Sequence, residues 1–362
     1  MSDLTPLHVR GVLLPDDAER DLWLVGDRIS FTPVDGATTI ASEGFVLPGL
    51  VDAHCHIGIG TEGAISTLDE ARAAAFVDRA AGTLAIRDAG SPFPYASLDD
   101  DPEMPRLSRA GRHLAAPKTH IRGVPRECSP EELPGAAAEE ARAGNGWVKL
   151  VGDWLDRGVA DLAPTFEAPV LAAAIEAAHR AGARVAVHTF GEEAVGGLIR
   201  AGVDSIEHGT GLSEEDIAEM ARRGTVLVPT MINIDTFADI ADRAEGKFPG
   251  YAAHMRALRA GFPAVVRAAY EAGVPIRVGT DAGSTIPHGV PGDEMLMLHS
   301  AAGMPALDVL AAASWDARAW LGLPGLVEGG LADLVVYETD PRADLRVVKA
   351  PSRIVLRGRV VR

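Results

Sequence analysis

Two histidines, His54 and His56, flank Cys55 in the stretch Val51–Ile57, which follows the apolar run Phe45–Leu50. Such a run indicates the end of a buried strand. Because alternate side chains of a strand share a face, both imidazoles should point one way and Cys55 the other. Imidazoles are good ligands for borderline metals such as zinc. A His-x-His pair alone is more often a pair of hydrogen-bonded core histidines, so further ligands are needed to decide.

The elements that must position these histidines occupy the middle of the chain. Residues 48–325 alternate short apolar runs with Ala-rich helical stretches, which predicts βα units and a (β/α)8 TIM barrel. Strands after the first are expected at Thr83–Arg87, Arg106–Ser108, Trp147–Val151, Arg184–His188, Ser205–Glu207, Val226–Val228 and Ile276–Val278. Helices are expected at Leu68–Ala81, Val170–Ala181, Glu192–Ala201, Ser213–Arg223 and Pro263–Ala272, the last with its proline at the first helical position.

Both ends of the chain are rich in short predicted strands. Residues 1–47 and 326–362 should together form a small β-sandwich domain built from both termini, which makes the α/β barrel the central domain. The expected strands are Leu7–Val12, Asp21–Val25, Arg28–Phe31, Asp333–Tyr337, Arg346–Val348, Arg353–Leu356 and Arg359–Val361.

More residues of ligand type fall at the ends of predicted barrel strands. His188 and His208 end the fifth and sixth strands, and Asp281 follows the eighth. Lys149 lies within the fourth strand, in an apolar run. Since the C-terminal strand ends of such a barrel meet at one face, these side chains should converge there with the first two histidines.

Lys149 has two interpretations. Burial disfavours the charged amine, and a neutral amine can take up carbon dioxide as a carbamate whose two oxygens each hold one cation. Alternatively, the lysine pairs with a carboxylate in the barrel, such as Asp281 or Glu207. The residues alone leave both open.

The composition excludes several classes of protein. A net charge of −17 argues against nucleic-acid binding. Two cysteines cannot form a disulfide framework, the stretch Met1–Arg10 lacks the apolar core of a secretory signal, and no apolar run has membrane-spanning length. We therefore expect a cytoplasmic protein with a small-molecule partner, no nucleic-acid or membrane partner, and an oligomeric state compatible with a homo-oligomer.

The ligand set, in its strand order, resembles the binuclear amidohydrolase superfamily. The segments Val185–Ala194, Ala201–Thr210 and Gly224–Thr230 resemble its imidazolonepropionase-like and Xaa-Pro-dipeptidase-like branch. Leu331–Tyr337 and Ile354–Val360 resemble its closing β domain. The resemblance extends over nearly the whole chain.

The resemblance implies a division of the ligands between two divalent ions. His54, His56 and Asp281 would hold one ion and His188 and His208 the other, with carboxylated Lys149 and a hydroxide bridging them. Zinc suits the His-rich set, while manganese and iron also suit the oxygen ligands. Asp281 would act as the general base and then protonate the leaving amine.

Substrate contacts are less strongly patterned. His120 matches the histidine that contacts the substrate carbonyl in dipeptidase-like relatives, and Ser284 and His288 follow Asp281 closely enough to line the pocket. Those relatives also hold a substrate carboxylate with a tyrosine and an arginine after the seventh strand, whereas Met231–Asp235 contains no tyrosine. The segment 231–262 is long enough to form a lid.

We therefore expect a metal-dependent hydrolase of an amide-type C–N bond, in an N-acyl, dipeptide-like or cyclic-amide substrate. The alternatives are a lactonase or esterase on the same metals, a mononuclear deaminase or imidazolonepropionase-like enzyme, and a non-catalytic homologue. Gly191 occupies the place of the catalytic glutamate of the mononuclear relatives, and Lys149 is retained. Both observations favour the binuclear hydrolase.

Overall fold

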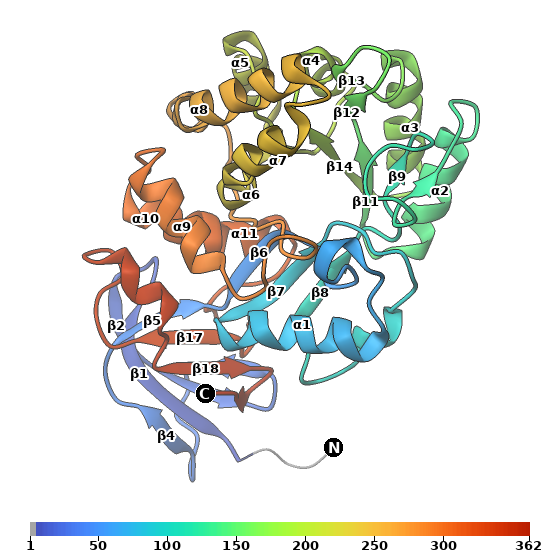
Figure 1. Cartoon of the computed structure of the whole chain (residues 1–362). Coiled ribbons are helices and arrows are strands. Elements are labelled where there is room, and N and C mark those ends of the chain that lie inside the picture. The colour runs from blue at the N-terminus through green and yellow to red at the C-terminus, as the bar shows by residue number, and fades with distance from the viewer. Residues whose placement is uncertain (1–4) are drawn as a thin grey trace.

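The computed structural model describes residues 5–362, apart from the side chain of Glu62. The first four residues of the stretch Met1–Arg10 therefore lie outside it. A large α/β body carries a smaller sheet to which both ends of the chain contribute (Figure 1). No helix within the described residues combines the length and the apolar character needed to cross a membrane.

Parallel strands form the centre of the α/β body. One sheet has the order β6-β7-β8 and another the order β10-β9-β11-β14-β15-β16. The strands are β6 (Leu50–Cys55), β7 (Thr83–Asp88), β8 (Arg106–Arg109), β9 (Leu114–Ala115), β10 (Arg126–Glu127), β11 (Trp147–Val151), β14 (Arg184–Thr189), β15 (Ser205–His208) and β16 (Val226–Val228). Buried residues throughout most of these strands suit a sheet that is covered on both faces.

The closed ladder expected of a (β/α)8 barrel is not present among the described residues. The predicted strand Ile276–Val278 is reduced to one bridge, from Leu227 to Ile276, and a hydrogen bond from Ala53 N to Val278 O. Beside β8, the side chain of Asn145 accepts a hydrogen bond from Arg109 N and donates one to Leu107 O. These bonds take the place of backbone pairing with a neighbouring strand. Because these segments are short and partly paired through a side chain, the assigned sheets stay open.

Helices pack around the strands and mostly match their predicted positions. The matching helices are α1 (Leu68–Ala80), α3 (Ala168–Arg180), α4 (Glu192–Arg200) and α5 (Glu214–Arg223). Ser213 caps α5 through a capping box with Asp216, as the sequence suggested. The others in the body are α2 (Leu133–Ala143), α9 (Pro291–Ser300), α10 (Ala306–Ala313) and α11 (Trp315–Trp320).

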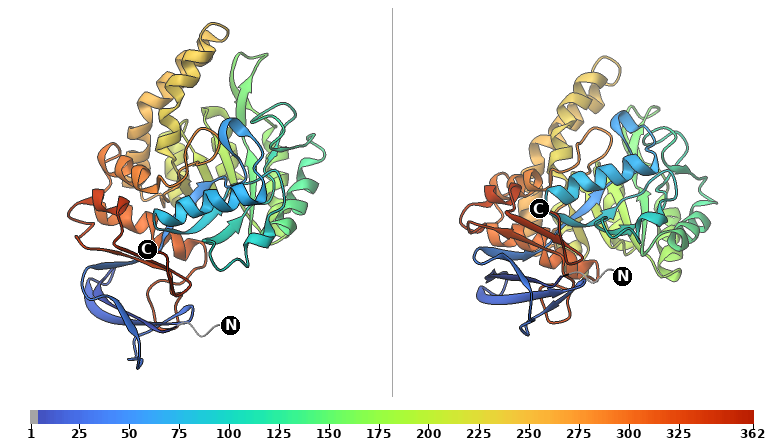
Figure 2. Two further views of the ribbon diagram at one scale, coloured as in Figure 1. Left: turned by 60° about the horizontal axis from the view of Figure 1, so that its bottom comes forward. Right: turned by 90° about the horizontal axis from the view of Figure 1, so that it is seen from below.

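The segment after β16 is helical rather than an extended loop. It forms α6 (Met231–Asp235), α7 (Phe237–Ala244) and the start of α8 (Pro249–Glu271), and α7 and α8 project together from the body (Figure 2). The predicted helix start at Pro263 was wrong, because this proline lies inside α8. The helix continues on both sides of it, with Phe262 and Val266 buried in the core.

Strands from both termini form one mixed sheet of eight strands, with the order β19-β18-β17-β5-β1-β2-β3 and β4 beside β1. They are β1 (Leu7–Leu13), β2 (Ala18–Val25), β3 (Arg28–Ser30), β4 (Thr38–Ala41), β5 (Phe45–Pro48), β17 (Leu334–Tyr337), β18 (Arg353–Leu356) and β19 (Arg359–Val360). The expected strand Arg346–Val348 is instead part of the 3-10 helix Leu345–Lys349.

A single sheet replaces the predicted β-sandwich. Along β17, Val335 and Tyr337 pack into the large core shared with the α/β body, whereas Leu334 and Val336 pack into a separate core of the sheet. One face is thus covered by the body, so a second sheet is not needed there. The boundaries 1–47, 48–325 and 326–362 stay predictions.

A buried ion cluster joins this sheet to the body. Asp333, directly before β17, accepts hydrogen bonds from Arg106 of β8 and Arg318 of α11. The side chains of Asp333 and Arg318 are both 0% exposed. The two arginines hold the pKa of the Asp333 carboxyl below its usual range although burial alone would raise it.

The cluster predicts a large stability effect for one substitution. Asp333→Ala leaves the guanidinium of Arg318 buried without its carboxylate, which should lower the free energy of unfolding by about 3–5 kcal/mol. The surface pair of Asp293 and Lys349 provides the control, because Asp293→Ala at an exposed pair should cost at most about 1 kcal/mol. Urea unfolding midpoints test this, and equal midpoints for the two variants would contradict it.

Candidate metal centre

The residues predicted as ligands line one cavity of about 330 Å³. His54 lies in β6 with His56 directly after it, Lys149 lies in β11, and Asp281 follows the segment that bridges β16. The set is completed at the ends of β14 and β15 by His188 and His208. The structure therefore brings these side chains together at one cavity.

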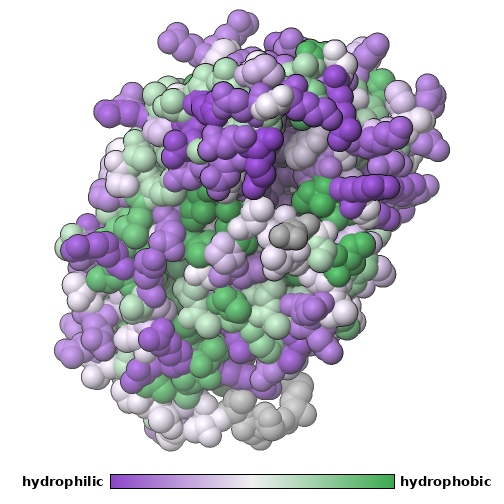
Figure 3. All heavy atoms as spheres, viewed as in Figure 1, coloured by the Kyte–Doolittle hydropathy of each residue, from purple (hydrophilic) through white to green (hydrophobic). Residues whose placement is uncertain are grey.

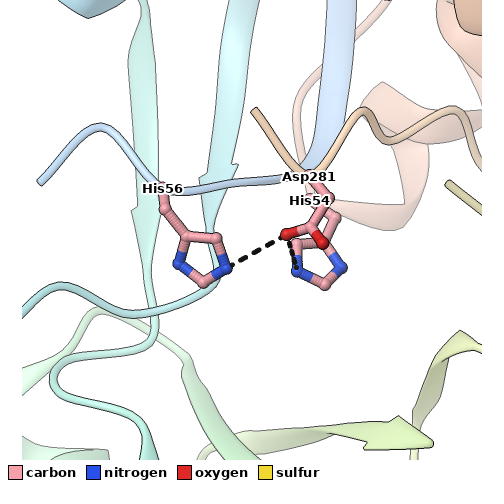
Figure 4. Close-up of side chains that lie close together, drawn as sticks. All are labelled: His54, His56 and Asp281. Carbon is pink, nitrogen blue, oxygen red and sulfur yellow. Dashed lines mark ion pairs between the residues drawn. The ribbon is translucent and has the colours of Figure 1, made fainter. Parts of the chain in front are cut away.

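The tightest group comprises His54, His56 and Asp281 (Figure 4). Asp281 Oδ1 lies 3.1 Å from His54 Nε2 and 3.3 Å from His56 Nε2. Ligand atoms of all three residues lie within 4.8 Å of one another. One carboxylate and two imidazoles at this spacing match a three-residue site for a divalent metal.

In three of the histidines, the ring nitrogen Nδ1 contacts another group of the protein. His54 Nδ1 lies 2.6 Å from Glu207 Oε2, His56 Nδ1 lies 2.8 Å from Gly90 O, and His208 Nδ1 lies 2.7 Å from Thr230 Oγ1. These contacts orient each ring so that Nε2 faces the cavity. Carboxylate and carbonyl partners of this kind fix the tautomer of metal-binding histidines.

A second group lies beside the first. The rings of His188 and His208 are 4.7 Å apart between centroids, and His208 Nε2 lies 4.0 Å from Asp281 Oδ2. His188 Nε2 is buried and lies 3.8 Å from Asp153 Oδ1, which is not part of the cavity lining. The rings of His188 and His208 and the carboxylate of Asp281 all line the cavity. Imidazole and carboxylate groups brought together in this way fit a second divalent ion.

Electrostatics favour the ligand forms of these groups. Burial lowers the pKa of His188 and His208 well below the ordinary value, so both imidazoles are neutral. Burial opposes ionisation of Asp281, but its hydrogen bonds and the neighbouring His54 hold its pKa well below the usual range. Neutral imidazoles and an ionised carboxylate are the forms that bind metals.

Lys149 is buried and faces the same histidines. Its Nζ lies 3.4 Å from His54 Nε2. No carboxylate in the described part of the chain lies within ion-pair distance of it, unlike the alternative in which it pairs with Asp281 or Glu207. Burial is the largest cause of its lowered pKa, about 8. A larger fraction of its amine is therefore neutral near physiological pH than for an exposed lysine, although the charged form still predominates.

Of the three predicted substrate contacts, two line the cavity and one does not. His120 and Ser284 line the cavity, and both adopt positive backbone φ angles, of 63° and 55°. His208 and Asp281 do the same at 67° and 57°. Strained non-glycine backbone of this kind is concentrated at functional sites.

His288 was placed wrongly. It is absent from the cavity lining and lies on the other side of β6, where its Nδ1 is 2.8 Å from Asp78 Oδ2 of α1. The loop 281–289 turns away from the cavity after Thr285, so proximity in sequence to Asp281 did not place His288 in the same site.

Several residues of the site escaped sequence analysis. His113 Nε2 lies 3.2 Å from His120 Nδ1, and Trp154 packs against the ring of His120 at 4.9 Å between centroids. Trp154 lies in a hairpin made of β12 (Asp153–Asp156) and β13 (Asp161–Pro164). Only His113 is of a type that could have signalled a role, and its position just before β9 gave no periodic pattern.

Helices α6 and α7 supply the outer wall. Asn233, Thr236, Asp239, Ile240 and Arg243 line the cavity from this side. The molecular surface is hollowed beside these helices, and polar side chains border the hollow (Figure 3). The segment considered as a lid therefore contributes directly to the pocket.

Comparison with known proteins agrees with this geometry. Residues 45–361 match the model of the Amidohydrolase family. The chain belongs to the amidohydrolase family. An uncharacterized protein of Mycobacterium tuberculosis is 54% identical over 354 residues, which cover 98% of this chain and 95% of that protein. Family membership identifies the chain as a hydrolase acting on C–N bonds.

Two further relatives have named activities. The ochratoxinase of Aspergillus niger is 31% identical over 185 residues, covering 50% of this amidohydrolase and 38% of the fungal protein. The crystal structure of a Xaa-Pro dipeptidase with bound methionine superimposes with a TM-score of 0.83 at 25% identity, covering 98% of this chain and 99% of that one.

The contact between Glu207 and His54 predicts how this amidohydrolase holds metal. Glu207→Gln should weaken metal affinity about 10–100-fold, because the His54 ring loses the carboxylate that orients it. Glu192→Gln is the matched control, since Glu192 is largely exposed and contacts His254 instead. Competition with a chromogenic chelator measures both. Unchanged affinity in Glu207→Gln would show that the contact does not support metal binding.

Proposed function

We propose that this amidohydrolase uses two divalent metal ions, with zinc as the expected metal, to cleave an amide-type C–N bond in a small molecule. One observation carries the proposal. Four imidazoles, a carboxylate and a lysine amine face one cavity of small-molecule size, and they come from β11, from the ends of β6, β14 and β15, and from the segment after Ile276–Val278. We also propose a cytoplasmic location and no nucleic-acid partner, and the net charge of −17 argues against nucleic-acid binding.

We assign the ligands by their grouping. His54, His56 and Asp281 would hold one ion, and His188 and His208 the other. Lys149 would join the two ions as a carbamate. Bound divalent ions lower the pKa of water towards neutrality and stabilise negative charge on a carbonyl oxygen. The lowered pKa of Lys149 supports this role, since only the neutral amine reacts with carbon dioxide.

Two side chains of the cavity would handle protons and the carbonyl group. Asp281 would accept a proton from the attacking water and return it to the leaving nitrogen, which converts the amine into a better leaving group. His120 would hydrogen-bond the substrate carbonyl. Its contact with His113 holds the ring at the cavity wall.

The remaining lining indicates the kind of substrate. Ile59, Ile121, Trp154, Phe190 and Ile240 offer apolar surface for an acyl group or a side chain. Arg243 adds a cation on α7 with no carboxylate of a described residue within ion-pair distance. This combination favours an N-acyl amino acid or dipeptide-like substrate over a neutral lactone.

The mononuclear alternative has less support. Gly191 lies where the mononuclear relatives carry a glutamate, and its backbone N–H donates to Asp153. The next residue, Glu192, contacts His254 on α8 rather than the cavity. No acidic side chain thus replaces the missing glutamate from this turn.

A substrate panel tests the function. Metal-loaded protein should hydrolyse N-acyl amino acids or dipeptides faster than matched amides that lack the carboxylate, because only the former can pair with Arg243. Liquid chromatography of the products measures this. Hydrolysis confined to lactones or esters, or persistence of activity after complete chelation, would contradict the proposal.

Asp281→Asn separates catalysis from metal binding in the same assay. The amide retains an oxygen ligand but cannot act as the base, so turnover should fall about 10²–10⁴-fold. Metal content, measured by elemental analysis, should fall much less. Near-normal turnover with full metal occupancy would show that another group is the base.

Lys149 yields a prediction of its own. Carbamate formation consumes one neutral amine and one carbon dioxide molecule and releases one proton. Reconstitution of the apo-protein should therefore be faster or fuller with added bicarbonate. Lys149→Ala should lose much of the activity and recover part of it with acetate, whereas Lys149→Arg should not recover, because a guanidinium stays protonated. Full metal loading and activity without carbon dioxide would refute the carbamate.

A further inference from the structure

A second cluster of ligand-type side chains lies behind the metal centre. Cys55, Asp78 and His288 bring a thiol, a carboxylate and an imidazole together, with ligand atoms within 4.8 Å of one another. Cys55 comes from β6, Asp78 from α1 and His288 from the loop 281–289. Because side chains alternate along a strand, Cys55 faces away from the cavity that His54 and His56 face.

The cluster is buried and poor in cations. Cys55 is 0% exposed and Asp78 is 1% exposed. Asp52 and Asp88, both 0% exposed, lie near the same thiol. Burial raises the pKa of the thiol, and these carboxylates raise it further. Their hydrogen-bond partners are neutral groups, namely backbone N–H groups and the hydroxyls of Thr280 and Ser91. In the described part of the chain, His288 is the one basic side chain paired with any of these carboxylates.

The contacts of Asp78 hold the loop but leave one nitrogen unused. Asp78 Oδ1 accepts a hydrogen bond of 2.7 Å from Gly289 N, and Oδ2 lies 2.8 Å from His288 Nδ1. His288 Nε2 is buried without a hydrogen-bond partner among the described residues. An imidazole with one unpaired nitrogen, close to a thiol and a carboxylate, is an environment that a soft or borderline cation satisfies.

We infer that Cys55, Asp78 and His288 form a separate binding site for one divalent cation of the zinc class. A thiolate and a carboxylate supply two negative charges, which one divalent ion neutralises, while the imidazole adds a neutral ligand. Binding releases the proton of the Cys55 thiol, because the thiolate is the ligand. With the ion bound, the buried group of thiolate, carboxylate and cation has no net charge, whereas without it separate charges would be buried.

An adjoining cavity gives the cation access. A cavity of about 590 Å³ lies next to the cluster and is lined by Ile57, Ser284 and His288. It can also hold a water as the fourth ligand of a tetrahedral ion. The ion would connect β6, α1 and the loop that begins with Asp281. It would therefore stabilise the loop from behind, independently of hydrolysis.

Cobalt titration of the chelator-treated protein tests the site. A thiolate bound to Co²⁺ produces a charge-transfer absorption in the near ultraviolet, whereas the His and carboxylate ligands of the cavity do not. The wild type should show this band. Cys55→Ser should abolish it, and Cys128→Ser should retain it, since Cys128 is the other buried cysteine of the chain and lies outside the cluster.

Metal counting supplies the second readout. Cys55→Ser and His288→Gln should each bind one zinc ion fewer than the wild type, whatever number the catalytic cavity holds. This difference keeps the test independent of the proposed function, which predicts the ions at the cavity. Absence of the band in the wild type would overturn the inference, as would its retention in Cys55→Ser or equal zinc content in all variants. If Cys55→Ser does not fold, the spectrum of Cys128→Ser decides, because Cys55 is then the one cysteine that remains.

Discussion

The candidate metal centre depends on the buried carboxylate of Glu207. It accepts two hydrogen bonds from Arg87, at 2.7 and 2.8 Å, and lies 2.6 Å from His54 Nδ1. Burial alone would raise its pKa, but Arg87 and His54 hold the pKa well below the usual range. Glu207 of β15 thus contacts Arg87 of β7 and His54 of β6. The carboxylate therefore holds together three strands beside the cavity. A buried ion pair requires this degree of hydrogen bonding to offset its desolvation.

Arg87 is itself held by aromatic rings. Its guanidinium lies 4.6 Å from the ring centroid of Trp147 and 5.0 Å from that of Trp320. Trp147 begins β11, the strand that carries Lys149, and Trp320 ends α11. Trp147 and Trp320 therefore position Arg87. Arg87 in turn holds the Glu207 carboxylate that contacts His54. Residues remote from the substrate share in setting the ligand geometry.

Because side chains alternate along β6, one face of the strand lies towards the cavity and the other towards α1. His54 faces the cavity, whereas Cys55 packs towards α1 with Ala71 and Ala75. The loop 281–289 passes along both faces, since Asp281 lies at the cavity and His288 lies behind the strand. Movement of this loop would consequently affect both clusters, which is the physical reason to consider them together.

The sequence by itself located the candidate ligands at the strand ends and most of the elements that carry them. His54, Lys149, His188, His208 and Asp281 follow from periodic apolar runs, because parallel strands bring their carboxyl ends to one face. Local signals also identified the helix start at Ser213, whose capping box depends on residues near in sequence.

Tertiary structure alone decided what depends on contacts between distant segments. Glu207 meets His54 and Arg87, and His288 meets Asp78, across separations that no local pattern records. Pro263 stays inside a helix because its neighbours are buried in the core. The terminal strands form one sheet because the α/β body already covers a face of it. Packing, rather than local propensity, made each of these choices.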